Sequence, residues 1–378
     1  MDRPFYTVDE ARLQARSRMP RMMFDFVDGA AGNERAERRN QDALEKILLQ
    51  PRVLQDISQL ELGKHFLGQS WSLPFGIAPM GMCDLAWPGT DLALAKVARE
   101  FQIPLTLSTA ASTSIETMQH QAGDCLWFQL YVGQSIEQAM TLVDRAAGAG
   151  CQVLVLTVDA QRVGVRPRDM RNGFKTPLRI GPRQFIDFAL HPHWSVNTLL
   201  SGVPRTANFS MDKGELAFKR ESTRGKVDLE FLHELRLKWK GKLVVKGIMS
   251  QRDAEQCVAA GVDALWVSNH GGRQLESAPS AISRLPLVRE ATGSDFPLIF
   301  DSGIRHGESV VKALAMGADF VMLGRPFLYA AGAAGERGIR TLVDVLTDEL
   351  AQTLAQLACV NIGDIDAQVL VRHDESRS

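Results

Sequence analysis

The sequence predicts an α/β protein whose strands and helices form a (β/α)8 TIM barrel. Three segments share one pattern, in which a helix ends near a glycine and an apolar run without alternation follows: 148–159, 259–270 and 315–326. Runs that are apolar on both faces are typical of parallel strands covered by helices. Eight such runs occur along the chain, which favours a closed barrel over an open doubly wound sheet.

The predicted strands are separated by helical segments and lie at 75–79, 104–108, 125–132, 152–159, 242–247, 264–269, 297–301 and 319–324. Residues 1–70 precede the first strand and form a helical extension, which begins with a capping box at Thr7 and Glu10. Residues 160–241 separate the fourth and fifth strands and are far longer than one crossover requires. We expect this insertion to be a lid or contact surface within a single domain that spans 1–378.

Composition and charge restrict the classes of function. The chain has 378 residues, 45% hydrophobic and 23% charged, with a formal net charge of −1, so no charge excess favours a nucleic-acid partner. The five cysteines are scattered without a Cys-x-x-Cys pair, which indicates free thiols in a reducing compartment and no metal site. The N-terminus lacks the apolar core of a secretory signal, and no apolar stretch is long enough to span a bilayer. We therefore expect a cytoplasmic protein.

Segment 183–209, in the middle of the insertion, mixes aromatic, proline and basic residues. One interpretation is a subdomain that packs on the rim of the barrel. The other is a patch that faces a membrane or a protein partner, which would place the protein peripherally on the inner face of the cell membrane.

Polar and charged side chains gather where the predicted strands end. In a TIM barrel these carboxyl ends meet on one rim, and that rim carries the active site. The residues at these ends are Pro79, Met80, Gly81, Ser108, Thr109, Gln129, Tyr131, Thr157, Asp159, Lys246, His270, Arg273, Asp301, Gly324 and Arg325. Their convergence predicts a catalytic site.

Four of these residues have side chains suited to acid–base chemistry on a small anion. His270 follows a strand and precedes two glycines, so it can approach a substrate, and its ordinary pKa near ~6.5 suits a general base. Arg273 can hold a carboxylate with two hydrogen bonds. Asp301 could orient the imidazole and stabilise its protonated form. Lys246 is either a Schiff-base amine or a fixed positive charge beside an electron-rich ring.

The loops after the last two strands predict a phosphate site. They contain Asp301-Ser302-Gly303-Ile304-Arg305 and Gly324-Arg325-Pro326. Glycine lets backbone N–H groups approach a phosphate and the guanidinium groups donate to its oxygens, at the corner where TIM barrels bind phosphate.

These motifs resemble one known family. SNHGGRQLE, LVVKG, FQLYV, LTVD, FDSGIRHG and LGRP are similar to segments of the FMN-dependent α-hydroxy-acid oxidases and dehydrogenases, and the resemblance covers nearly the whole chain. It is strongest to the mandelate dehydrogenases, including LSTA, CLWFQLYV, HPHWS and ANF. The resemblance implies oxidation of an L-2-hydroxy acid to the 2-oxo acid, with FMN as cofactor and a homotetrameric assembly.

The resemblance also implies roles for individual residues. His270 would be the base and Asp301 would stabilise its imidazolium. Arg166 and Arg273 would bind the substrate carboxylate, and Tyr131 would donate to a substrate oxygen. Lys246 would offset negative charge on the reduced flavin ring. The other FMN contacts would be Pro79, Met80, Gly81, Ser108, Gln129, Thr157, Ser268, Asp301, Ser302, Gly303, Arg305, Gly324 and Arg325.

Three departures from the family pattern bear on the substrate. Phe26 stands where the family usually has a tyrosine that donates to the substrate carboxylate, and Met80 stands where a threonine beside the flavin is common. Ala110 occupies a place that glycolate oxidase fills with tryptophan, which leaves room for a bulky substrate such as a mandelate-like acid. Gly81 matches the dehydrogenase members, which pass electrons to a quinone or another carrier.

Three alternatives stay open. One is an oxidase that produces hydrogen peroxide, and another is a flavin-binding protein that Phe26 has impaired in catalysis. The third is a non-redox flavoenzyme like the flavin-dependent isopentenyl diphosphate isomerases.

Overall fold

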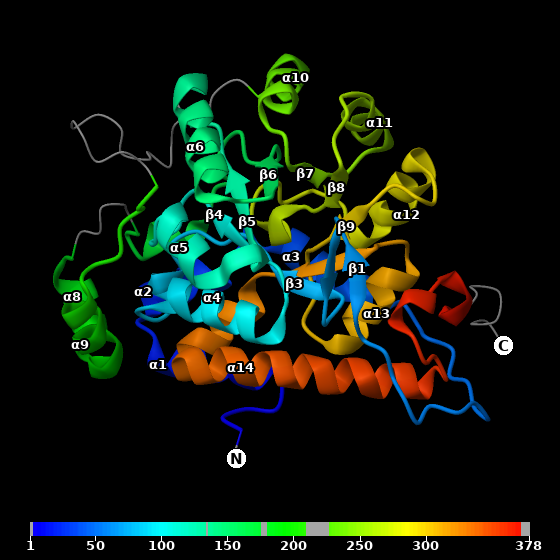
Figure 1. The fold of residues 1–378 in the computed structure, drawn as a ribbon. Helices are drawn as coiled ribbons and strands as arrows, with labels where there is room; N and C mark the ends of the chain where they lie inside the picture. The colour runs from blue at the N-terminus through cyan, green and yellow to red at the C-terminus, as the bar shows by residue number, and fades with distance from the viewer. Residues whose placement is uncertain (1–2, 134, 175–179, 209–226, 372–378) are drawn as a thin grey trace.

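The computed structural model describes residues 3–133, 135–174, 180–208 and 227–371, and it shows a closed barrel of parallel strands surrounded by helices (Figure 1). The strands follow one another in chain order around the barrel, and the last pairs with the first through Val321 and Phe75. The predicted TIM barrel is therefore confirmed. The strands are β3 (Phe75–Ile77), β4 (Leu105–Ser108), β5 (Leu126–Leu130), β6 (Val153–Thr157), β7 (Lys242–Ile248), β8 (Ala264–Val267), β9 (Leu298–Phe300) and β10 (Phe320–Leu323).

The strands are apolar on both faces because one face fills the barrel and the other packs against helices. Large side chains such as Phe128, Trp266 and Phe300 are fully buried there. The helices that follow the barrel strands are α4 (Thr90–Phe101), α5 (Ile115–Ala122), α6 (Ile136–Ala149), α10 (Leu229–Lys238), α11 (Gln251–Ala259), α12 (Ala281–Thr292), α13 (Gly307–Ala315) and α14 (Arg325–Gln356).

A short antiparallel hairpin precedes the first barrel strand. It consists of β1 (Lys64–Phe66) and β2 (Gln69–Trp71). Phe66 stacks on Phe320 with ring centroids 5.0 Å apart, and Trp71 meets Trp127 edge-on at 6.2 Å. The hairpin therefore extends the aromatic core beyond the strands. The sequence did not predict it.

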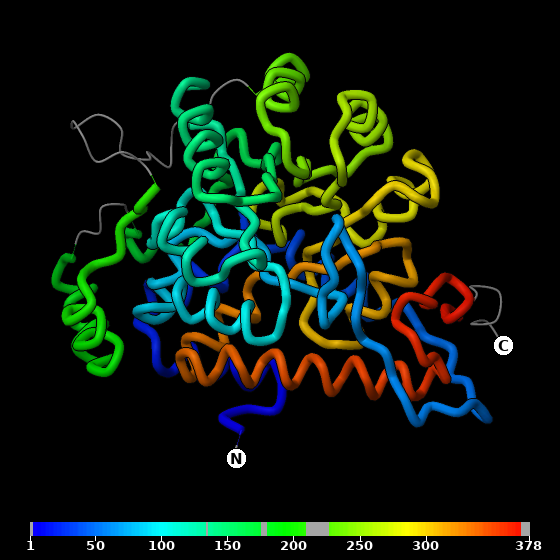
Figure 2. Tube along the Cα trace, in the orientation of Figure 1, coloured from blue at the N-terminus to red at the C-terminus, as the bar shows by residue number. Residues whose placement is uncertain are grey.

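The N-terminal extension is helical, as expected, and is held by the last long helix. The Thr7 side chain accepts a hydrogen bond from the Glu10 backbone, which confirms one half of the predicted capping box, while the Glu10 carboxylate accepts the Tyr6 backbone N–H. This helix packs against α14, which runs along one side of the barrel (Figure 2). The three helices of the extension are α1 (Val8–Arg18), α2 (Arg21–Asp28) and α3 (Arg35–Glu45).

The insertion after β6 carries α7 (Pro167–Arg171), α8 (Pro182–Ala189) and α9 (Pro192–Ser201) before it reaches α10. In Figure 1, α8 and α9 lie at the side of the molecule, beyond α2. The Trp194 indole anchors α9, since it is buried and donates to the Leu85 carbonyl at 3.1 Å. Within the described ranges, no helix combines the length and the apolar character needed to cross a bilayer.

Candidate active site

The loop after β8 turns sharply because three consecutive residues have left-handed backbone angles. His270, Gly271 and Gly272 have φ of 59°, 63° and 75°. Glycine adopts this conformation without strain, whereas His270 does not. The Ser302 hydroxyl supports the turn, since it accepts the backbone N–H groups of Asn269 at 3.3 Å and of Gly271 at 3.1 Å. The glycines after the histidine therefore permit the backbone turn that projects its imidazole.

The His270 imidazole lies between a carboxylate and a phenol. Its Nδ1 is 3.0 Å from Asp159 Oδ1, and its Nε2 is 3.4 Å from the Tyr131 hydroxyl. A carboxylate only accepts hydrogen bonds, so Nδ1 carries a proton and donates it to Asp159. Nε2 is then left with its lone pair on the side of Tyr131. This tautomer is the one that a general base requires.

The surroundings keep the imidazole neutral and the carboxylate charged. Burial lowers the pKa of His270 below its ordinary value, and the Lys246 cation adds to this effect, while Asp159 opposes it. Burial opposes ionisation of Asp159, yet His270 and Lys246 together bring the pKa of this carboxyl below its usual range. Neutral His270 is therefore ready to accept a proton at neutral pH, and ionised Asp159 can stabilise the imidazolium that results.

The expectation that Asp301 orients the imidazole is wrong, although its charge raises the pKa of His270 and so favours the imidazolium. Its Oδ2 lies 3.1 Å from Lys246 Nζ, and its Oδ1 accepts the Ser302 hydroxyl at 2.7 Å. Asp159 binds the imidazole instead. It stands two residues after Thr157, where it extends beyond the end of β6. The sequence placed both Asp159 and Asp301 on the rim. Which of the two carboxylates contacts the imidazole depends on the direction of each side chain, which the sequence does not show.

Lys246 is a buried cation with defined partners. Besides Asp301, its ammonium contacts the Ser268 hydroxyl at 2.8 Å and lies 5.2 Å from the centre of the Trp266 ring. Burial opposes the charge, but Asp301 and Asp159 raise the pKa of Lys246 above its ordinary value. The amine therefore stays protonated, which favours the fixed positive charge over the Schiff-base role.

The mouth of the barrel has polar atoms that fit the ring of a flavin. The Gln129 amide oxygen accepts the Ser108 hydroxyl at 3.2 Å and the Thr109 backbone N–H at 3.3 Å. Within the described part of the chain, Gln129 Nε2 and Thr157 Oγ1 are buried and find no hydrogen-bond partner. Buried polar atoms rarely stay unpaired, so this donor and this hydroxyl suit the carbonyl and N–H edge of an isoalloxazine.

The predicted phosphate corner brings two arginines together. Arg305 and Arg325 both approach the Glu37 carboxylate, and the Arg325 guanidinium also donates to the Gly271 carbonyl at 2.7 Å. Gly303, in the loop that carries Arg305, has φ of 96°. A Cβ on Gly303 would approach Asn40 and Leu44 of α3 at 3.0 Å, so the loop needs glycine for close packing. The grouped guanidiniums fit a phosphate, although Glu37 was not expected there.

Gly81, Met80 and Ala110 lie at the first two strand ends. A Cβ on Gly81 would lie 3.1 Å from the Ala110 Cβ, and a Cβ on Gly324 would lie 3.7 Å from the Met80 sulfur. Small residues therefore meet at this part of the rim. Pro79 immediately precedes Met80 in the same loop.

Arg273 points toward the N-terminal extension. Its guanidinium donates to the carbonyls of Phe26 at 2.9 Å, Val27 at 3.1 Å and Gly29 at 2.5 Å. It also lies 5.6 Å from the centre of the Phe26 ring, which stacks on Phe174 with centroids 4.4 Å apart. A hydrogen bond from Arg273 to a substrate carboxylate stays a prediction, as does the contact of Phe26 with substrate.

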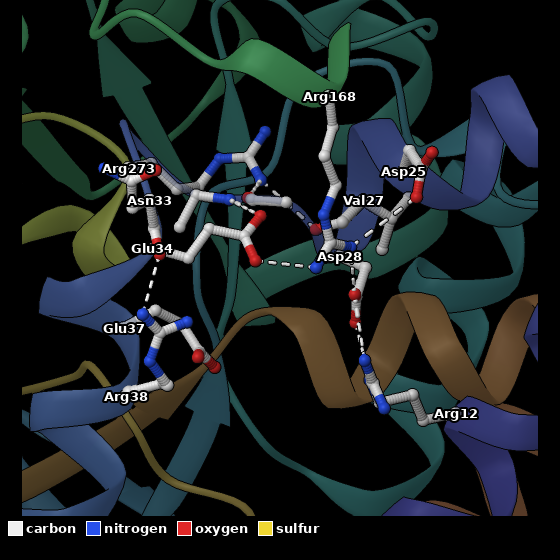
Figure 3. A network of polar contacts seen from close by, with 12 residues as sticks. Arg12, Asp25, Val27, Asp28, Asn33, Glu34, Glu37, Arg38, Arg168 and Arg273 are labelled. Carbon is white, nitrogen blue, oxygen red and sulfur yellow. Dashed lines mark hydrogen bonds and ion pairs between the residues drawn. The ribbon is translucent and has the colours of Figure 1, made fainter. Parts of the chain in front are cut away.

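Arg166 is the N-cap residue of α7 and is largely buried, with its guanidinium 3.8 Å from the Asp169 carboxylate. Its neighbour Arg168 ties this helix to the N-terminal extension. Figure 3 shows Asp28 between Arg12 and Arg168. Arg168 contacts Asp28 at 2.6 Å and Glu34 at 2.6 Å. Sequence reasoning missed this network, because its members are distant in the chain.

A TIM barrel whose rim holds a neutral imidazole, a buried ammonium and paired guanidiniums defines an enzyme that handles small anions with a phosphorylated cofactor. The model of the FMN-dependent dehydrogenase family matches residues 15–372. The (S)-mandelate dehydrogenase of Pseudomonas putida is 38% identical over 376 residues, which cover 98% of this chain and 95% of that protein. The L-lactate dehydrogenase of Xanthobacter autotrophicus is 36% identical over 381 residues, covering 96% of each chain.

A solved structure agrees with these matches. The crystal structure of the monotopic membrane protein (S)-mandelate dehydrogenase matches with a TM-score of 0.91 and 38% identity, covering 97% of this chain and 99% of that chain. The chain belongs to the FMN-dependent dehydrogenase family. It is an FMN-dependent oxidoreductase related to the 2-hydroxy-acid dehydrogenases, which confirms the resemblance and the cofactor.

Proposed function

We propose that this chain oxidises a bulky, mandelate-like L-2-hydroxy acid to the 2-oxo acid and passes the electrons through FMN to a quinone or another carrier. The observation that carries this proposal is the His270 imidazole held between Asp159 and Tyr131, with distances of 3.0 Å and 3.4 Å. FMN, when bound, supplies the acceptor for two electrons from the substrate. The remaining steps belong to side chains of this protein.

His270 is the base in this proposal. Its Nε2 removes a proton from the substrate, and Asp159 stabilises the imidazolium through Nδ1. Tyr131 lies beside Nε2, so its hydroxyl can donate to a substrate oxygen. Arg166 and Arg273 bind the carboxylate; the Arg273 guanidinium has five N–H donors, and its three hydrogen bonds to backbone carbonyls of the extension use three of them.

The FMN ring would be held by Gln129, Thr157 and Ser108, with Gly81, Met80 and Pro79 along its edge. Lys246, held by Ser268 and Asp301, would place a positive charge beside the ring. Arg305 and Arg325 would bind the phosphate. The backbone N–H groups of Ser302, Gly303 and Gly324 would approach it closely. The unpaired atoms of Gln129 and Thr157 support this orientation.

The proposed substrate class is supported by a small side chain at the rim, by a related mandelate dehydrogenase and by an aromatic stack. Ala110 leaves more room at the rim than the tryptophan of glycolate oxidase would, and it packs so near Gly81 that a Cβ there would lie 3.1 Å from its own. The relative that is 38% identical is a mandelate dehydrogenase, whose substrate has an aromatic side chain. Phe26 and Phe174 form an aromatic stack under Arg273 that favours an aromatic substrate over glycolate.

The proposal that the protein attaches to a membrane rests on the apolar surface of α8 and α9. Six large apolar side chains are exposed here: Phe185 and Ile186 on α8, Leu190 directly after α8, and Val196, Leu199 and Leu200 on α9. A soluble protein rarely exposes so many neighbouring apolar residues without a partner, and the related (S)-mandelate dehydrogenase is a monotopic membrane protein. We infer peripheral attachment to the inner face of the cell membrane through this α8–α9 apolar surface, and a homotetramer as in the family.

The proposal is tested by mixing the purified yellow protein with single enantiomers of 2-hydroxy acids in the absence of oxygen. Loss of the visible flavin absorbance with S-mandelate, faster than with glycolate or with R-mandelate, supports the proposed substrate. Absence of bleaching by every 2-hydroxy acid would contradict turnover and would favour a flavin-binding protein without catalysis.

Admission of air or of a soluble quinone to the reduced protein then identifies the acceptor. We expect fast reoxidation by the quinone and slow reoxidation by oxygen. The reverse order, with production of hydrogen peroxide, would show that the protein is an oxidase.

A further inference from the structure

The two arginines of the phosphate corner share a carboxylate that belongs to the protein itself. Glu37 Oε1 lies 3.3 Å from a guanidinium nitrogen of Arg305 and 3.4 Å from one of Arg325. The Gln41 side-chain amide donates to the same oxygen. Little solvent reaches the group, since the side chains of Arg305 and Arg325 are 12% and 9% exposed and that of Glu37 is 20% exposed.

The carboxylate cannot retreat easily, because α3 is packed tightly against the catalytic loops. A Cβ on Gly272 would lie 2.5 Å from the Glu37 backbone nitrogen, so the loop after β8 rests directly on the first turn of α3. One turn further, the side chains of Asn40 and Asn269 exchange two hydrogen bonds of 2.8 Å and 2.7 Å. These contacts fix the start of the Glu37 side chain beside both guanidiniums.

Charge balance shows why this arrangement matters. A phosphate monoester carries about −1.5 to −2 charges at pH 7, which two guanidiniums would nearly match. Glu37 reduces the local charge from +2 to +1 by simple addition of the three groups. It also occupies donors that a phosphate would otherwise use. In a site with so little solvent, the repulsion between two anions is weakly screened.

We propose that Glu37 determines the specificity of the cofactor site by competing with the FMN phosphate for Arg305 and Arg325. The glutamate weakens the binding of FMN. It therefore reduces the difference in affinity between FMN and riboflavin, which lacks the phosphate. The inference rests on the proposed assignment of Arg305 and Arg325 to the phosphate, and it is independent of the substrate.

The test measures dissociation constants for FMN and for riboflavin, by flavin fluorescence, on the full chain stripped of flavin. Glu37→Gln keeps the size of the side chain and removes its charge. We expect it to strengthen FMN binding by about tenfold, with riboflavin binding unchanged, so the riboflavin dissociation constant divided by the FMN dissociation constant rises. An unchanged or smaller ratio would overturn the inference. Glu45→Gln is the control, because it makes the same chemical change at an exposed position of α3.

Two further variants separate a failure of the Glu37 proposal from a failure to fold and from a wrong phosphate assignment. Glu37→Met also removes the charge and replaces Glu37→Gln if that protein does not fold. Arg325→Met tests the phosphate assignment, because it should weaken FMN binding and leave riboflavin binding unchanged. If Arg325→Met leaves the ratio unchanged, the phosphate does not lie here and the inference fails with it. If Arg325→Met lowers the ratio while neither Glu37 variant raises it, only the role of Glu37 is wrong.

Discussion

The mouth of the barrel and the α8–α9 apolar surface differ in which kind of side chain they bury and which they expose. At the mouth, charged groups such as Lys246, Asp301 and Asp159 are withdrawn from solvent and each has a defined partner. On α8 and α9, large apolar groups such as Leu199 and Leu200 are exposed. The first region has the features of a reaction site and the second has the features of an attachment surface. The comparison predicts that catalysis and location can be altered separately.

The largest expected effect follows from removing the charge at the centre of the mouth. Lys246→Met leaves Asp301 buried without its cation, and breaking such a pair costs about 3–5 kcal/mol of the free energy of unfolding. We expect a lower unfolding midpoint in urea and loss of bound flavin during purification. The double variant Lys246→Met, Asp301→Asn should recover part of the stability. A single variant as stable as the original protein would show that the pair is unimportant.

The next effect concerns Asp159, the partner of the proposed base His270. Asp159→Asn removes the carboxylate that stabilises the imidazolium, so kcat should fall on the order of 10²–10⁴-fold. The direction in which the pH dependence of kcat/KM should shift can also be predicted. The base works when neutral, and burial lowers the pKa of His270, so the acid limb of kcat/KM should lie below the ordinary histidine pKa. Asp159 opposes that lowering, and its removal should move the limb to still lower pH.

Asp301→Asn provides the comparison for this profile. Asp301 is paired with Lys246, so its removal should shift the acid limb less than Asp159→Asn does. A larger shift with Asp301→Asn would restore the original expectation that Asp301 orients the imidazole.

A smaller effect is expected where the insertion joins the N-terminal extension. Arg168 holds Asp28 and Glu34, and through α7 it positions Arg166. Arg168→Met should raise KM about tenfold and change kcat little, because substrate placement is disturbed while the base is intact. Arg171→Met, on the exposed side of the same helix, is the control. Equal losses of kcat in both variants would argue against a positioning role.

The smallest effect on turnover is expected on the apolar surface. Leu199→Glu combined with Leu200→Glu should leave oxidation with a soluble acceptor unchanged and should abolish sedimentation with vesicles of bacterial phospholipid. Burial of these side chains in the interface stabilises attachment, and two carboxylates would oppose it. Leu237→Glu, at an exposed leucine of α10, should retain vesicle binding. Sedimentation of the double variant with vesicles would contradict the membrane proposal.

The sequence predicted the barrel well because its signal is local. Apolar runs such as those of β6 and β7 are bounded by glycine and polar residues, and they need no long-range information. The hairpin β1–β2 was missed because two three-residue strands leave no periodic pattern. Its Phe66 and Trp71 became visible as core residues only through their contacts with barrel aromatics.

The sequence predicted which residues lie on the rim, but it did not predict which side chains pair with each other. The end of each strand placed His270, Lys246, Asp159 and Asp301 together. Which carboxylate meets which cation depends on side-chain directions a few ångströms apart, and the sequence contains no such distances. Glu37 was missed for another reason, since it lies on a helix outside the barrel and reaches the phosphate corner only through the packing of α3.

The central claim is that the imidazole of His270 accepts the proton when a 2-hydroxy acid is oxidised. The most direct measurement is the rate of anaerobic flavin bleaching by S-mandelate in a single turnover, compared between the original protein and His270→Gln at equal flavin content. We predict that His270→Gln binds FMN normally and bleaches on the order of 10²–10⁴-fold more slowly. Bleaching of this variant at the original rate would contradict the account.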